Sequence, residues 1–251
     1  MDFFKPERIA QLKALSHEGK PFVFDDGDIR TLQFDERIVQ SAMRLSAPDE
    51  LLIPYTQAMT GFLLFNPAPA HILLVGLGGG SLVKYCYKHL PATRLTVLEI
   101  DADVIALREQ FMIPADDARL QVVHADARSY ISEMQEESTD VILLDGFDAE
   151  GAAEELNTYA FFNDCRRVLR ENGILLMNMA DDMNTATAAL TQGQSLFTLG
   201  RLWWLKTVDG NSHLAVMLKV ADEVADTDLR DRIMQMCRQF SLELIYPRHL
   251  V

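Results

Sequence analysis

The sequence predicts an α/β fold: a doubly wound, seven-stranded sheet preceded by a small β-rich domain. From residue 71 onward, short apolar runs alternate with helical patterns, which is typical of a parallel sheet covered by helices on both faces. Near the end of the chain, two strand-like runs follow one another directly, which indicates an antiparallel hairpin at one edge. We therefore expect a small domain over residues 1–48 and the main α/β domain over residues 49–251.

The small domain should contain two short strands within residues 22–34, because Asp-Gly between apolar runs favours a hairpin. A helix is expected over about 49–65, with Asp49 near its N-cap. The remaining elements follow in alternation. Strands are expected at 71–75, 94–99, 120–123, 140–145, 174–179, 201–208 and 213–220, and helices at about 81–90, 101–111, 126–134, 154–170, 184–197 and 227–240.

Composition excludes several classes of protein. The chain has 251 residues, of which 49% are apolar and 24% charged, as in ordinary globular proteins. Its net charge of −14 repels phosphate backbones, so we expect no nucleic-acid partner. Residues 51–83 carry no charge, but prolines and glycines interrupt them, so we expect no membrane span. The three cysteines are widely spaced and the histidines lack ligand spacing, which predicts a reducing compartment and no metal site.

A glycine-rich turn follows the first strand of the main sheet. It contains Gly76, Gly78, Gly79 and Gly80 and opens the next helix. Glycines let the backbone approach a ligand, and a helix N-terminus offers free N–H groups. The turn alone could be only a tight connection. Ser81 stands where a dinucleotide-binding turn needs glycine or alanine, which disfavours a nicotinamide dinucleotide.

Acidic residues end three successive strands. Glu99 can accept both ribose hydroxyls, Asp126 with Ala127 could meet the amine of adenine, and Asp145 ends the fourth strand. Any one of these acids could be a helix N-cap, and Asp101 fits that role best. Together they indicate a nucleoside site at the carboxyl edge of the sheet. Since carboxylates repel a diphosphate and attract a sulfonium, we favour an S-adenosylmethionine-type ligand.

The chain resembles the spermidine synthase (polyamine aminopropyltransferase) family from about residue 26 to residue 179. The matching motifs are Asp26-Gly27, Asp35-Glu36, the glycine run 75–81, the V-E-I-D-like run 98–101, Asp126-Ala127 and the D-V-I-L-L-D-G-F-D run 140–148. The resemblance implies a Rossmann-like, class I methyltransferase-like main domain. It also implies a cytoplasmic homodimer that uses S-adenosylmethionine or its decarboxylated form, without a metal, to alkylate an amine or polyamine.

The resemblance also implies individual roles. Glu99 would bind the ribose and Asp126 the adenine, while Asp145 would be the catalytic acid/base and Asp148 would hold the amine substrate. Attack on a carbon next to the sulfonium needs a neutral amine, and a carboxylate within hydrogen-bond reach can take its proton. The acceptor substrate cannot be read from the sequence.

Two departures from the family pattern concern the tail of the co-substrate. Gly79 stands where the family has an aspartate for the aminopropyl ammonium, and Arg30 replaces a nearby glutamine. A guanidinium there would suit the carboxylate of intact S-adenosylmethionine, although Arg30 could equally be an exposed hairpin residue. An aminopropyltransferase is favoured. A methyltransferase on the same scaffold and a non-catalytic nucleoside-binding protein stay open as alternatives.

Overall fold

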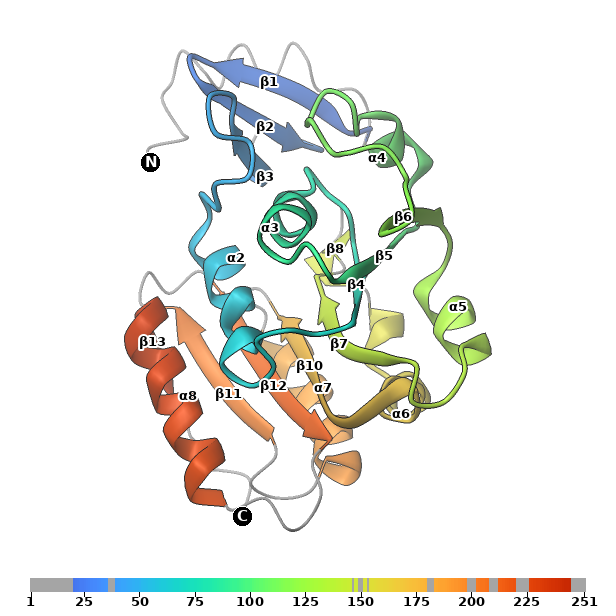
Figure 1. Cartoon of the computed structure of the whole chain (residues 1–251), viewed down its shortest axis with the longest axis vertical. Helices are drawn as coiled ribbons and strands as arrows, with labels where there is room; N and C mark the ends of the chain where they lie inside the picture. Colours follow the sequence, from blue (N-terminus) through green and yellow to red (C-terminus); the bar gives the residue numbers. More distant parts are fainter. Residues whose placement is uncertain are drawn as a thin grey trace.

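The computed structural model describes residues 20–35, 39–145, 147–148, 151–152, 154–179, 183–197, 202–207, 212–219 and 226–244. Within these residues, an eight-stranded sheet forms the main body and a three-stranded antiparallel sheet forms a small second layer (Figure 1). The small sheet contains β1 (Phe22–Asp26), β2 (Ile29–Gln33) and β3 (Val39–Arg44). The hairpin expected around the Asp-Gly turn is therefore confirmed, and β3 extends it.

The main sheet has the order β13-β11-β12-β10-β7-β4-β5-β6. Its central pairs from β10 to β6 are parallel, while β10–β12, β12–β11 and β11–β13 are antiparallel. The strands are β4 (His71–Val75), β5 (Arg94–Glu99), β6 (Leu120–His124), β7 (Thr139–Leu144), β10 (Leu169–Asn178), β11 (Leu202–Thr207), β12 (His213–Lys219) and β13 (Leu242–Leu244). The chain order reverses between β4 and β7, which is where doubly wound sheets bind ligands.

Helices cover both faces of this sheet, as the alternating pattern predicts. They are α2 (Pro54–Met59), η1 (Thr60–Leu64), α3 (Ser81–His89), α4 (Ala102–Ala106), α5 (Ala127–Glu133), η2 (Glu154–Leu156), α6 (Tyr159–Val168), α7 (Met183–Leu196) and α8 (Asp226–Phe240). Two short strands, β8 (Phe147–Asp148) and β9 (Gly151–Ala152), pair with each other. The doubly wound α/β fold expected from the sequence is confirmed.

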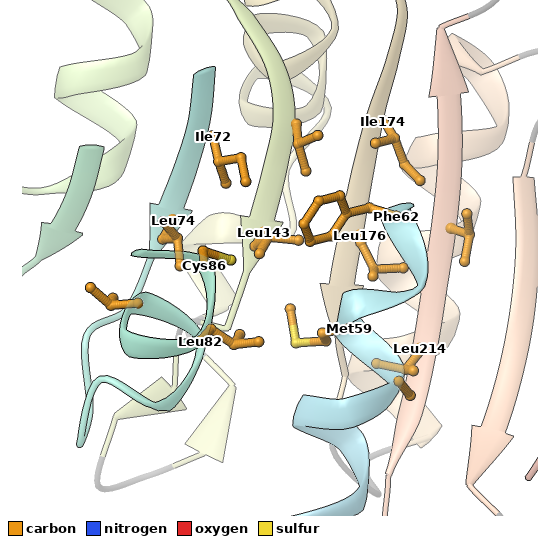
Figure 2. Close-up of a cluster of buried hydrophobic side chains, with 14 of the residues drawn as sticks. Met59, Phe62, Ile72, Leu74, Leu82, Cys86, Leu143, Ile174, Leu176 and Leu214 are labelled. Carbon is orange, nitrogen blue, oxygen red and sulfur yellow. The ribbon is translucent and has the colours of Figure 1, made fainter. Parts of the chain in front are cut away.

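Alternate residues of each central strand enter two separate cores. In β4, Ile72 and Leu74 pack with α2, η1, α3 and α8, whereas Leu73 and Val75 pack with α5, α6 and α7. Figure 2 shows the first core, where Phe62 of η1 lies over the sheet. A strand that is buried on both faces has no polar side to alternate with, which is why these strands read as continuous apolar runs.

The structure adds two strands to those expected and shortens several of the expected helices. The seven expected strands are present, but β13 adds an eighth and β3 was not expected. The expected helix over 49–65 begins only at Pro54, whose missing N–H suits a first turn, and Asp49 pairs with Lys88 instead. The helix expected over 101–111 ends at Ala106. Short elements carry too few residues to show a clear period.

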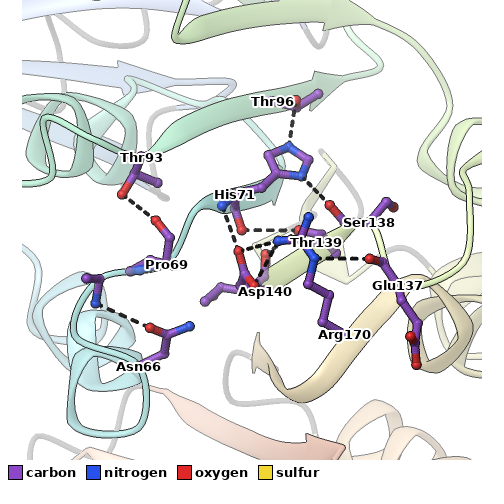
Figure 3. A network of polar contacts seen from close by, with 12 residues as sticks. Asn66, Pro69, His71, Thr93, Thr96, Glu137, Ser138, Thr139, Asp140 and Arg170 are labelled. Carbon is purple, nitrogen blue, oxygen red and sulfur yellow. Dashed lines mark hydrogen bonds and ion pairs between the residues drawn. The ribbon is translucent and has the colours of Figure 1, made fainter.

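A buried histidine lies at the opposite end of the sheet from the carboxyl edge. The ring of His71 contacts the Ser138 carbonyl through Nδ1 (3.2 Å) and the Thr96 hydroxyl through Nε2 (3.0 Å) (Figure 3). Because a carbonyl only accepts, Nδ1 carries the proton and Nε2 accepts from Thr96. Burial lowers the pKa of His71, so the folded protein favours the neutral ring.

This histidine should make the fold sensitive to mild acid. The unfolded chain binds a proton near pH 6.5, whereas folded His71 does so only at lower pH. The free energy of unfolding should therefore fall as pH drops below about 6.5 and level off below the folded pKa. Urea unfolding of the parent protein and of His71→Gln between pH 5 and 8 checks this. An equal acid dependence in both proteins would contradict it.

Candidate nucleoside and amine site

One cavity of about 640 Å³ lies at the carboxyl edge of the sheet, beneath the small N-terminal sheet. Strands β4, β5 and β7 end at it, and β2, β3 and α2 close its other side. Its described polar lining includes Gln40, Ser41, Tyr55, Thr56, Ser81, Glu99, Asp101, His124 and Asp145, and no lysine or arginine is among these lining residues. The volume is typical of a small-molecule site, and the charge is suited to a cation.

The glycine turn serves two purposes. Gly76 (φ +95°) and Gly78 (φ +49°) line the cavity, in left-handed conformations that favour glycine. Gly79 and Gly80 do not line it. A Cβ at Gly79 would lie 2.6 Å from the Ser41 hydroxyl, and one at Gly80 would lie 2.5 Å from Ile113. The structure therefore brings two of the four glycines to the predicted site. At the other two positions, close packing against neighbouring segments explains why the residue is glycine.

Glu99 is buried at the end of β5 and lines the cavity. One carboxylate oxygen accepts the N–H of Leu77 (2.8 Å) and the other accepts the N–H of Asp101 (2.9 Å). Each oxygen keeps a further acceptor position, so the carboxylate can still meet two hydroxyls of a ligand. Asp101 caps α4 by accepting the Asp103 N–H, as expected.

Asp126 and Ala127 lie outside the cavity lining. Asp126 caps α5 and forms a 2.7 Å ion pair with Arg128, and hydrogen bonding to that arginine lowers its pKa. Ala127 is buried as the first residue of α5. At the ends of β5 and β6 the cavity is lined instead by Ile100, which is 65% exposed, and by His124. An exposed apolar side chain next to Glu99 is suited to pack on a purine face.

Arg30 is likewise absent from the described cavity lining. Its guanidinium binds both carboxylate oxygens of Asp25 at 2.7 Å and the carbonyl of Gln110 at 2.6 Å. These bonds tie the small sheet to the segment after α4. In this structure the guanidinium holds a carboxylate of its own chain, which favours the alternative that Arg30 is a hairpin residue over a contact with the carboxylate of a ligand.

Asp145 follows β7 and is the best-defined acid of the site. Its backbone N–H donates to the carbonyl of Val75 (2.9 Å), the Asn178 amide donates to Oδ1 (2.9 Å), and the Tyr55 hydroxyl donates to Oδ2 (3.1 Å). Burial raises its pKa, and the two side-chain hydrogen bonds oppose that rise. Asp148 lies on β8, and its side chain is outside the described residues.

The cavity is therefore acidic and partly apolar, and the Asp145 carboxylate in its lining can accept a proton. Within the described ranges, no cluster of three His, Cys, Asp or Glu could hold a metal ion, and no described helix is long and apolar enough to cross a membrane. Tyr55 and Asn178 were missed at the sequence level. The sequence does contain a signal for Asn178, because a polar amide at the end of an apolar strand is placed to reach the site at the carboxyl edge of the sheet.

Comparison with known proteins gives one family. The model of the spermine/spermidine synthase domain matches residues 52–196. A polyamine aminopropyltransferase of Neisseria meningitidis serogroup A is 41% identical over 158 residues, which span 62% of this chain and 60% of that relative.

Solved structures show the same fold. A probable spermidine synthase from Corynebacterium glutamicum superposes with a TM-score of 0.70 at 18% identity, covering 90% of this chain and 93% of that one. A spermidine synthase in complex with the transition-state analogue AdoDATO superposes with a TM-score of 0.61 at 20% identity, covering 90% of this chain and 81% of that one.

Proposed function

The chain belongs to the spermine/spermidine synthase domain family, and we propose that it is a transferase that alkylates an amine with S-adenosylmethionine or its decarboxylated form. One observation carries the proposal: Asp145 lines an acidic cavity beside the glycine turn, held by two donors in a half-buried position. Such a carboxylate can accept a proton from a nucleophile, and the acidic lining suits a sulfonium co-substrate.

In the proposed reaction, Asp145 accepts a proton from the attacking amine. A free alkylamine has a pKa of roughly 10, so it is mostly protonated at neutral pH and cannot attack. As the proton moves to Asp145, the nitrogen forms a bond to the carbon next to sulfur, and the carbon–sulfur bond breaks to leave a neutral thioether. Glu99 would hold the ribose hydroxyls and Gly76 and Gly78 would let the backbone approach the nucleoside, which aligns the two reactants.

Aminopropyl transfer to a polyamine is the favoured form of this reaction. The Neisseria relative is named a polyamine aminopropyltransferase, and the structural neighbour binds AdoDATO. The family resemblance also leads us to propose a cytoplasmic homodimer, with Asp148 as a contact for the acceptor amine. Three buried free cysteines, Cys86, Cys165 and Cys237, are consistent with a reducing compartment.

Methyl transfer is the second candidate, because Gly79 lacks the carboxylate that the family uses for the aminopropyl ammonium. The packing of Gly79 against Ser41 and Phe111 leaves no room for one. Incubation with a diamine and each co-substrate, followed by mass spectrometry, decides between the candidates. Methylthioadenosine from the decarboxylated form would support aminopropyl transfer, and S-adenosylhomocysteine from the intact form would support methyl transfer. Neither product, with retained binding of methylthioadenosine, would indicate a non-catalytic protein.

Removing Glu99 should weaken nucleoside binding. Glu99→Ala leaves the ribose hydroxyls without acceptors, and we expect the affinity for methylthioadenosine to fall by about 1–3 kcal/mol. Calorimetry measures this, with circular dichroism to confirm folding. Glu133→Ala, which removes an exposed carboxylate on α5, is the matched control. Unchanged affinity in a folded Glu99→Ala protein would mean that the nucleoside binds elsewhere.

A further inference from the structure

The glycine turn is covered by a segment that comes from another part of the chain. Residues 107–113 follow α4, and we call them the cover segment. A Cβ at Gly79 would lie 2.9 Å from the ring of Phe111, and one at Gly80 would lie 2.5 Å from the side chain of Ile113. The conformation of the turn therefore depends on where the cover segment lies.

Strand β3 of the small sheet packs on the same turn. The Ser41 hydroxyl lies 2.6 Å from the position of a Cβ at Gly79, and it lies 3.4 Å from the Ser81 hydroxyl at the start of α3. Ser41, Ser81 and Gly78 all line the cavity. The cover segment and β3 together therefore support the wall of the cavity that contains the glycine turn.

Lys84 contacts both of these supports. It lies on α3 three residues after Ser81, is 4% exposed, and is outside the described cavity lining. Its amine donates to the Phe111 carbonyl (2.8 Å) and to the Met43 sulfur (3.0 Å). Met43 follows Ser41 by two residues on β3, so both side chains lie on the same face of that strand, which is next to α3 (Figure 1). One buried amine therefore connects α3, β3 and the cover segment.

We propose that Lys84 is a positioning residue, which holds the cover segment and β3 against the glycine turn and thereby sets the affinity for the co-substrate. The proposal deepens the function given above and rests on it for the identity of the ligand. A hydrogen bond restrains the Phe111 carbonyl in both distance and angle, whereas apolar packing at the same position has no preferred direction.

The effect of losing this amine should be local. Arg30 also binds the cover segment, through the carbonyl of Gln110 (2.6 Å), so the small sheet stays tied to that segment when Lys84 is replaced. Neither acceptor of the Lys84 amine carries a full charge to replace its lost hydration. An apolar side chain of similar size should therefore keep the fold at least as stable while it frees the glycine turn.

Amide hydrogen exchange tests the positioning role without a ligand. Lys84→Met keeps an unbranched side chain of similar size and loses the donor. The amides of Gly80 and Ile113 each donate to a backbone carbonyl within the turn and the cover segment. In Lys84→Met they should exchange roughly tenfold faster, because a hydrogen bond that restrains both segments is lost. Lys88→Met, which removes an exposed lysine of the same helix, should leave their exchange unchanged.

Two further measurements separate positioning from a purely structural role. Denaturant unfolding should show that Lys84→Met is no less stable than the parent protein, and the amides of β4 should exchange no faster. Faster exchange at the turn then cannot come from a weaker fold. Lys84→Gln, whose side chain is one bond shorter, also loses the contact with the Phe111 carbonyl and serves if Lys84→Met fails to fold.

Binding then connects the turn to the ligand. In Lys84→Met, the Kd for methylthioadenosine and the KM for the co-substrate should both rise by roughly tenfold. At saturation kcat should stay the same, because Lys84 bonds to none of the groups that hold Asp145. Parent-like exchange in the folded variants, or faster exchange with unchanged Kd, would overturn the positioning role. Faster exchange and weaker binding, in a protein whose parent alkylates no amine, would support the positioning role and reject the proposed function.

Discussion

Asp145→Asn is expected to lower the rate of amine alkylation by roughly 10²–10⁴-fold while nucleoside binding persists. The substitution keeps the shape of the side chain but removes the group that takes the proton. It also leaves one amide oxygen where two oxygens accept from Tyr55 and Asn178, so one donor loses its acceptor. The effect should therefore fall on the chemical step, since the nucleoside contacts proposed for Glu99 are untouched.

Single-turnover rates and calorimetry with methylthioadenosine separate these two effects. Asp164→Asn is the control, because Asp164 lies on α6 and pairs with Arg167 outside the described cavity lining. An Asp145→Asn protein that keeps most of its rate would assign Asp145 to structure. Loss of both rate and binding would show that the substitution disturbs the cavity as a whole.

The fold follows from the sequence wherever an element is long or fully buried. The continuous apolar run of β4 predicts a central strand, because Ile72 and Leu73 face two different cores. Strand β3 has only Val39 and Met43 as large apolar residues, and β13 has three residues in all. Strand β3 pairs with β2, its neighbour in the chain, but its residues do not show a clear apolar alternation, and β13 pairs with the distant strand β11, so the local pattern could not reveal either of them.

The sequence predicts the position of a site residue that lies at the end of a strand. It does not predict the position of a residue whose side chain is held by a partner elsewhere in the fold. Glu99 and Asp145 reach the cavity because the carboxyl ends of parallel strands meet at one edge. Arg30 does not, because it lies directly across the hairpin from Asp25. That pairing could have been read from the Asp-Gly turn, since cross-strand opposite charges attract. The contact between Gly79 and Ser41 joins segments that no local pattern relates.

Lys84 adds a buried amine outside the cavity lining. It lies on α3, is 4% exposed, and donates to the Phe111 carbonyl (2.8 Å) and to the Met43 sulfur (3.0 Å). Neither acceptor carries a full charge to replace lost hydration. Burial accordingly lowers the pKa of this amine from 10.5 to about 7, while Asp49 acts weakly against that shift.

This lysine should make the protein more stable as pH rises above 7. Between pH 7 and 10.5 the unfolded chain keeps the proton and folded Lys84 has lost it, so the contribution of Lys84 to the free energy of unfolding should rise by at most about 1.4 kcal/mol for each pH unit. Lys84→Met removes the buried charge among apolar neighbours and should stabilise the protein by about 1–4 kcal/mol at pH 6. It should also abolish the rise in the free energy of unfolding with pH.

Denaturant unfolding of both proteins from pH 6 to 10 measures this, with Lys206→Met on β11 as the control. If the stability of the parent protein relative to Lys84→Met does not rise with pH, the Lys84 ammonium stays protonated inside the fold, and the contacts to Phe111 and Met43 are then stronger than their neutral chemistry suggests.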